Sequence, residues 1–163
     1  MTDYISKIYS LLKRLSLVVV LFSLSRLFFY FFNISLFSEL GFWDLIWLFI
    51  VGIRFDLSVI IYFNILVILL YLIPVGKVFN SKIYQSIINF FFISINTILL
   101  SVNLSDSVFF HFTQKRSTID VVKFIFISDD IMDLVPKFIS DYWYVSIIIV
   151  FIAFALSIPN IIK

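Results

Sequence analysis

The sequence predicts an all-α integral membrane protein with about four transmembrane helices and short interfacial helices on its outer side. Hydrophobic residues make up 63% of the chain and charged residues only 13%, with a mean hydropathy of +1.14. In soluble domains about a quarter of the residues are charged. The polar residues are therefore too few to cover a water-facing surface. Several apolar runs also exceed the roughly 18 residues needed to cross a bilayer core.

Residues 1–163 are predicted to form a single multi-span membrane domain. Its spans are expected at approximately residues 15–37, 42–73, 83–104 and 143–158. No small-x-small cleavage site follows the first run, so this run reads as a retained signal anchor. The second run ends at Pro74 and Gly76, which break a helix. Asp141-Tyr142-Trp143-Tyr144 precedes the fourth run, and this aromatic composition is typical of a membrane interface.

The distribution of Lys and Arg predicts the orientation in the bacterial cytoplasmic membrane. One side of the predicted topology carries Lys7, Lys13, Arg14, Lys77, Lys82 and Lys163. The positive-inside rule makes that side cytoplasmic, together with both chain ends. Residues 106–141 then lie outside. Capping patterns at residues 117–120 and 128–130 predict two short helices on the outer surface, the alternative being a plain connection between spans.

Two charged residues interrupt the second apolar run. Arg54 lies about 15 Å below the outer surface at 1.5 Å per residue, and Asp56 lies at a similar depth. Because successive helix positions turn by about 100°, the two side chains project to nearly opposite faces. Arg26 of the first span reaches a similar depth. We therefore expect Arg26 to pair with Asp56, and Arg54 to face a polar cavity or an anionic group. Such residues are candidates for function, and a purely structural ion pair is the alternative.

The third span carries an amide every seven residues. Asn89, Asn96 and Asn103 share one helix face. This pattern predicts hydrogen bonding between helices in preference to a polar conduit. His111 has no second metal ligand at helical spacing, so no metal site or cofactor is predicted. The absence of cysteine excludes thiolate chemistry. The basic residues sit at loop ends and form no patch, which gives no support for nucleic-acid binding.

Three short motifs resemble a known family. They are Gly52-x-Arg54-Phe55-Asp56, Asn103-x-x-Asp106-x-x-Phe109-Phe110 and Arg116-Ser117-Thr118. Their order and spacing resemble the N-terminal membrane domain of the lipoteichoic acid synthase and phosphoglycerol transferase family, as found in Bacteroidetes-type bacteria. The members are sulfatase-like enzymes of the alkaline phosphatase superfamily.

The resemblance implies a five-span anchor followed by a large outer catalytic domain. That domain would hold a divalent metal and a threonine nucleophile, and it would transfer or hydrolyse phosphoglycerol or related ester groups. This chain carries neither a fifth span nor that domain, so it is expected to be a membrane-anchor fragment. No catalytic residue can be assigned to it.

A polar network at the outer side is the predicted site. Arg54, Asp56, Asp106 and Arg116 would either position a lipid substrate, such as an anionic phospholipid, or lock the spans together. The expected partners are membrane lipids and the missing C-terminal catalytic domain. The alternative is a complete four-helix membrane protein, such as a transporter subunit or assembly factor.

Overall fold

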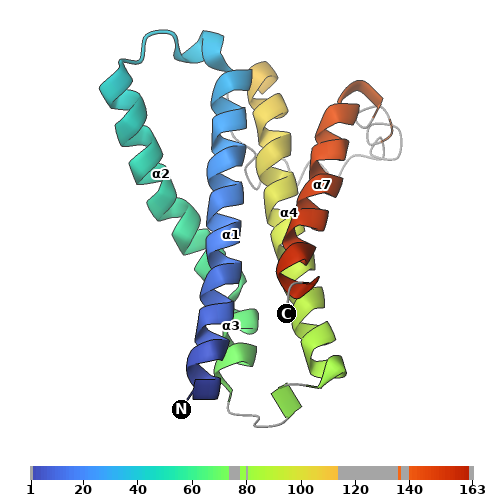
Figure 1. Ribbon diagram of the computed structural model, residues 1–163. Coiled ribbons are helices and arrows are strands. Elements are labelled where there is room, and N and C mark those ends of the chain that lie inside the picture. Colours follow the sequence, from blue (N-terminus) through green and yellow to red (C-terminus); the bar gives the residue numbers. More distant parts are fainter. Residues whose placement is uncertain (1, 74–77, 80, 114–135, 137–139, 162–163) are drawn as a thin grey trace.

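The computed structural model describes residues 2–73, 78–79, 81–113, 136 and 140–161. All regular elements within these residues are helical (Figure 1). They are α1 (Thr2–Phe32), the 3₁₀ helix η1 (Ile34–Phe37), α2 (Phe42–Phe63), α3 (Ile65–Leu72), α4 (Lys82–Thr113) and α7 (Trp143–Ile161). The prediction of an all-α fold is confirmed for this part of the chain.

Three helices are long and apolar enough to cross a membrane. These spans are Tyr4–Phe32, Phe42–Phe63 and Lys82–Val108. The stretch Trp143–Ile158 of α7 is also apolar but shorter. The predicted fourth span is thus present as a helix, but its apolar stretch is shorter than the three spans that are long enough to cross a membrane.

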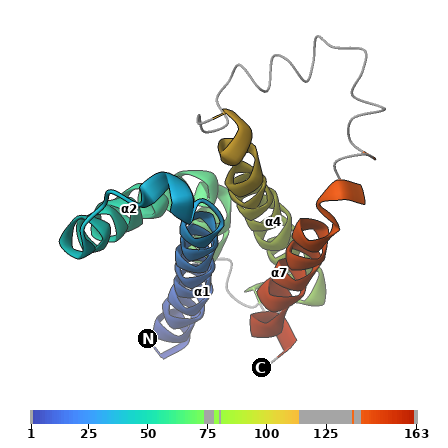
Figure 2. The ribbon, with the colours of Figure 1, turned by 90° about the horizontal axis from the view of Figure 1, so that it is seen from above.

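Helices α1, α4 and α7 pack side by side as a bundle (Figure 1). Seen from above, α2 extends from α1 away from α7 (Figure 2). Buried residues on α1 recur at intervals of three or four, as expected for one face of a helix: Leu11, Arg14, Val18, Phe22 and Ser25. Buried residues of α4 recur every four from Ile88 to Leu104: Ile88, Phe92, Asn96, Leu100 and Leu104. The core is therefore formed where these two stripes meet, with α7 packed against α4.

The first helix begins earlier and ends earlier than the predicted span 15–37. It starts at Thr2, so Lys7, Lys13 and Arg14 belong to the helix and not to a preceding loop. Two of these cations have aromatic neighbours, since the Lys7 ammonium lies 4.1 Å from the Phe79 ring centroid and the Arg14 guanidinium lies 5.5 Å from that of Tyr71. Contacts of this kind stabilise a cation away from water.

The predicted second span, 42–73, is divided at Asn64. Asn64 lies between α2 and α3 with φ −89° and ψ 11°, and its side chain donates a hydrogen bond to the carbonyl oxygen of Ile60 at 2.9 Å. α3 ends at Leu72 because Ile73, which precedes Pro74, is extended with ψ 127°. The break allows α3 to pack against α1 and α4 while α2 diverges (Figure 1).

Asn64 is held in the core by an amide on the opposite helix. Its Nδ2 donates to Oδ1 of Asn96 at 3.0 Å, and Nδ2 of Asn96 donates back to Oδ1 of Asn64 at 2.8 Å. Both side chains are fully buried. A reciprocal pair of this kind satisfies both amides and joins the helix break to α4.

This amide pair should show measurable coupling. We expect Asn64→Ala and Asn96→Ala to destabilise the fold non-additively, with a coupling energy of about 0.6–2 kcal/mol. The coupling energy is measured by unfolding the wild type, the two single variants and the double variant in mixed detergent micelles. Ser101→Ala is the matched control, because Ser101 Oγ bonds only within its own helix, to the Thr97 carbonyl oxygen at 2.7 Å. Additive effects for Asn64 and Asn96 would contradict the expectation.

The outward segment predicted at 106–141 begins later than expected. Residues 106–113 continue α4, and this end of the helix contacts α1 and Asn33, the residue that follows α1. Asn33 Nδ2 donates to the Ser107 carbonyl oxygen at 2.8 Å, and the Phe110 ring lies 5.0 Å from that of Phe29. The two predicted surface helices at 117–120 and 128–130 lie outside the described residues.

Candidate functional site

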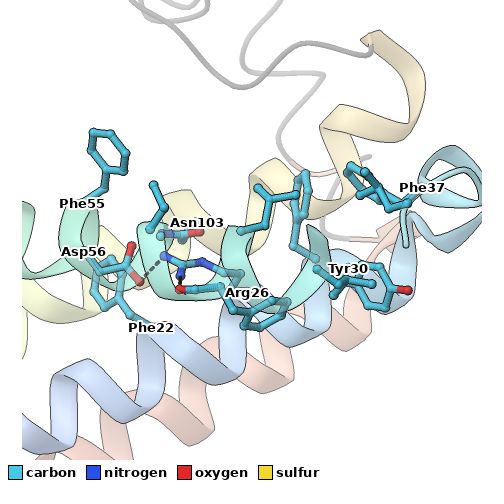
Figure 3. A pocket seen from close by; sticks show the side chains of 14 residues that line it. Phe22, Arg26, Tyr30, Phe37, Phe55, Asp56 and Asn103 are labelled. Atoms are coloured by element: carbon cyan, nitrogen blue, oxygen red, sulfur yellow. Dashed lines mark hydrogen bonds and ion pairs between the residues drawn. The ribbon is translucent and has the colours of Figure 1, made fainter. Parts of the chain in front are cut away.

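A cavity of about 280 Å³ lies between the C-terminal half of α1, η1 and α2, with α4 contributing one residue. Most of its lining is apolar and aromatic. Its polar lining side chains are Arg26, Tyr30, Asp56 and Asn103. Figure 3 shows that Arg26, Asp56 and Asn103 lie close together, whereas Tyr30 lies toward Phe37. The cavity therefore has a polar end and an otherwise apolar wall.

Arg26 and Asp56 form the ion pair at the polar end. Arg26 Nη2 lies 2.5 Å from Asp56 Oδ2, and Nη1 donates to the carbonyl oxygen of Phe49 at 2.9 Å (Figure 3). The side chains of Arg26 and Asp56 are 21% and 14% exposed, so most of the ion pair is buried inside the protein. The structure thus brings together the two residues that were expected to pair on grounds of depth.

Gly52 makes room for this ion pair. A Cβ built on Gly52 would overlap the Arg26 guanidinium group. Gly52 and Asp56 are four residues apart on α2 and therefore share one face of the helix. The motif Gly52-x-Arg54-Phe55-Asp56 thus has a physical meaning, since one residue provides the space for Arg26 and another provides its counter-charge.

Alanine at position 52 should destabilise the protein. In a helix interior, Gly→Ala usually stabilises by roughly 1 kcal/mol. Here the guanidinium must move and lose hydrogen bonds, so we expect a net loss of about 1–3 kcal/mol. Thermal unfolding in micelles tests this. Gly41→Ala is the comparison: Gly41 is the N-cap of α2, and its Cβ would meet the Asp44 carboxylate at 3.1 Å, a smaller conflict than the overlap at Gly52. Equal stability of the two variants would refute the role given to Gly52.

Two other members of the predicted polar network, Arg54 and Asp106, do not line this cavity. The Arg54 side chain is exposed on α2 and does not line this cavity. That Arg54 faces a polar cavity or an anionic group therefore stays a prediction. Asp106 is buried on α4, 6% exposed. Arg116 lies outside the described residues. The geometry therefore separates Arg54 from Asp56, as their angular spacing on a helix requires.

The three amides of α4 occupy three successive levels of the bundle. Asn89 accepts a hydrogen bond from Arg14 Nη1 at 2.8 Å, and Asn96 pairs with Asn64. Asn103 lines the cavity beside the ion pair (Figure 3). The first two join helices, as expected from their spacing, and the third borders the candidate site.

Arg14 is the polar residue that the sequence reasoning missed. It is only 2% exposed, and the Tyr71 and Phe92 rings both lie 5.5 Å from its guanidinium carbon. Its Nε has no hydrogen-bond partner, and no ion pair of Arg14 is present among the described residues. A signal was present in the sequence: Arg14 lies three residues after Leu11 and four before Val18, so the three side chains share the buried face of α1.

Among the described residues, no group of three or more His, Asp or Glu side chains is arranged to hold a metal ion. The class that fold and site define is a helical membrane protein with an ion pair, amide contacts and a cavity between its helices. No protein-family model, curated protein or solved structure matches the chain.

Proposed function

We propose that this chain is the membrane-anchor domain of a sulfatase-like phosphoglycerol transferase or hydrolase that acts at the outer face of the bacterial cytoplasmic membrane. The observation that carries the proposal is the shared role of Gly52 and Asp56. Both residues of the family-like motif serve the same contact with Arg26. A motif used to fix two membrane helices suits a domain that must hold an outer enzyme in a defined position.

In this proposal the chemistry belongs to a domain outside this chain. That domain would carry the threonine nucleophile and bind the divalent metal, so no residue of this chain has a catalytic role. Arg54 is exposed on α2. In this proposal its long side chain extends from within the span toward the phosphate of an anionic phospholipid, and Arg116 is its proposed partner in that contact.

The size of the native polypeptide tests the proposal. Source membranes would be probed with an antibody against the N-terminal peptide, followed by mass spectrometry of the band. We expect a species much heavier than 19.2 kDa, with peptides from an outer domain. A band at 19.2 kDa would overturn the enzyme reading. It would favour the complete four-helix alternative, a transporter subunit or assembly factor.

The lipid-contact role of Arg54 and Arg116 has its own test in the longer protein. We expect Arg54→Ala and Arg116→Ala to lower activity while the amount of protein in the membrane is retained. Loss of the protein itself would instead indicate that the two residues lock the spans together. Unchanged activity and unchanged protein would show that neither role is correct.

The proposed orientation places both chain ends in the cytoplasm. Because the chain contains no cysteine, single cysteines can be introduced without background labelling. Glu39→Cys and Lys82→Cys are a matched pair, since both positions are exposed and lie at opposite ends of the predicted topology. A membrane-impermeant thiol reagent should label position 39 in intact cells and position 82 only after lysis. The reverse pattern would invert the orientation.

A further inference from the structure

We propose that the cavity between α1 and α2 binds the uncharged, hydrogen-bonding end of a single-chain amphiphile, such as a long-chain alcohol, and rejects an anionic head group. This proposal rests on the charges, shape and opening of the cavity. It does not depend on an outer catalytic domain.

The charges of the lining residues cancel. Arg26 and Asp56 are the charged members of the lining, and they are paired with each other. An anion placed beside them would lie next to the Asp56 carboxylate, and its burial without a cation of its own would be unfavourable. The polar end of the cavity is thus suited to a neutral group.

A hydroxyl group matches the hydrogen-bonding character of the polar end. It can donate to a carboxylate or amide oxygen and accept from a guanidinium or amide N–H. Asp56 supplies acceptor oxygens, Arg26 supplies donors and the amide of Asn103 supplies both, and the three side chains lie together in Figure 3. Because a carboxylate or amide oxygen has two acceptor lone pairs, a group that both donates and accepts can add to the contacts that these side chains already make.

The remaining walls are suited to a hydrocarbon chain. They are formed by aromatic and aliphatic side chains that include Phe22, Phe29, Phe37, Leu45, Phe49 and Val51. Drug-sized ligands occupy roughly 300–1,000 Å³, so a cavity of about 280 Å³ takes only one end of an amphiphile.

The cavity opens toward the surrounding lipid. Leu48 and Phe55 line it and are also 52% and 67% exposed, so they stand at its edge. An amphiphile can therefore enter from the bilayer with its polar end inside. The rest of its chain then lies along the exposed apolar surface of α2.

Photocrosslinking with two matched probes tests the proposal. The full chain, purified and reconstituted in phosphatidylcholine vesicles, is exposed to diazirine-labelled hexadecanol or to diazirine-labelled hexadecyl phosphate, which differ only in the head group. Crosslinks to peptides containing Phe22, Leu48 or Phe55 are counted by mass spectrometry. We expect about tenfold more with the alcohol. Equal labelling, or more labelling with the phosphate, would overturn the proposal.

Two variants show that labelling reports the cavity. Val51→Phe fills it and should abolish most of the crosslinking by the alcohol. Val59→Phe is the matched control on the same helix, because Val59 is exposed and does not line the cavity. If Val59→Phe lowered labelling as much as Val51→Phe, the probe would be binding the outer surface of α2 and the proposal would fail.

A charge change at the polar end makes the test specific. Asp56→Asn leaves Arg26 uncompensated, so the preference should move toward hexadecyl phosphate by about tenfold. An unchanged preference in a folded Asp56→Asn variant would contradict the charge argument. Should this variant fail to fold, the wild-type comparison and the Val51→Phe result still decide the proposal.

Discussion

Replacing Asn89 with leucine should destabilise the protein by about 3 kcal/mol or more, because it leaves a buried arginine without its hydrogen-bond acceptor. Arg14 is 2% exposed and donates to Asn89 Oδ1 at 2.8 Å. The Tyr71 and Phe92 rings remain near the cation but accept no such hydrogen bond. Unfolding in mixed detergent micelles, or the yield of folded protein in membranes, provides the measurement.

A double variant distinguishes the loss of the Arg14–Asn89 hydrogen bond from the cost of leaving the Arg14 charge buried without an acceptor. Arg14→Met combined with Asn89→Leu removes the cation together with its acceptor and keeps the volume similar. Such replacements are often neutral or stabilising. We therefore expect the double variant to recover most of the stability that Asn89→Leu loses. A double variant no more stable than Asn89→Leu would show that Arg14 itself contributes stability, and the interpretation would be wrong.

Replacing Asp56 with leucine should produce the second large effect, a loss of roughly 3 kcal/mol. Arg26 would lose its counter-charge and keep, of the contacts at this site, the hydrogen bond to the Phe49 carbonyl oxygen. Its partial exposure lets the side chain reorient, so the effect should not exceed that of Asn89→Leu. Thermal unfolding of the purified chain in micelles measures the difference.

The companion variant Arg26→Met/Asp56→Leu distinguishes a lock from a binding site. If the pair serves only to hold α1 to α2, the double variant should fold and keep the amount of protein found in the membrane. If the pair also receives a ligand, the double variant should fold but lose the preference for the alcohol probe. Failure of the double variant to fold would show that apolar contacts cannot replace the pair at this position.

The hydropathy of the sequence, together with the depth of each charged residue along its span, predicted much of this structure. The long apolar runs became helices, and counting residues from the ends of two spans placed Arg26 opposite Asp56. The helix break at Asn64 was not foreseen, because one amide in an apolar run gives no local signal. Asn64 bonds both to the Ile60 carbonyl oxygen of α2 and to Asn96 of α4, and the second contact is displayed by no single-sequence pattern.

The burial of Arg14 was missed for a different reason. Basic residues before an apolar run usually flank a membrane span, so Arg14 was assigned to the flank. Its helical spacing from Leu11 and Val18, which places it on the buried face of α1, was therefore not considered. Similarly, the role of Gly52 depends on a guanidinium from another helix. The burial of Arg14 and the role of Gly52 both depend on which faces of two helices meet. The spacing of residues along one helix does not give this information.

The positions of the polar partners impose an order on the biogenesis of this protein. α1 carries two arginines, and their partners come from later parts of the chain, Asp56 on α2 and Asn89 on α4. A first helix that enters the bilayer alone would hold both cations without these partners, at a cost of a few kcal/mol each. α1 is therefore expected to stay associated with the insertion machinery until α4 has been synthesised. Chains interrupted before α4 should be targets for quality-control proteolysis.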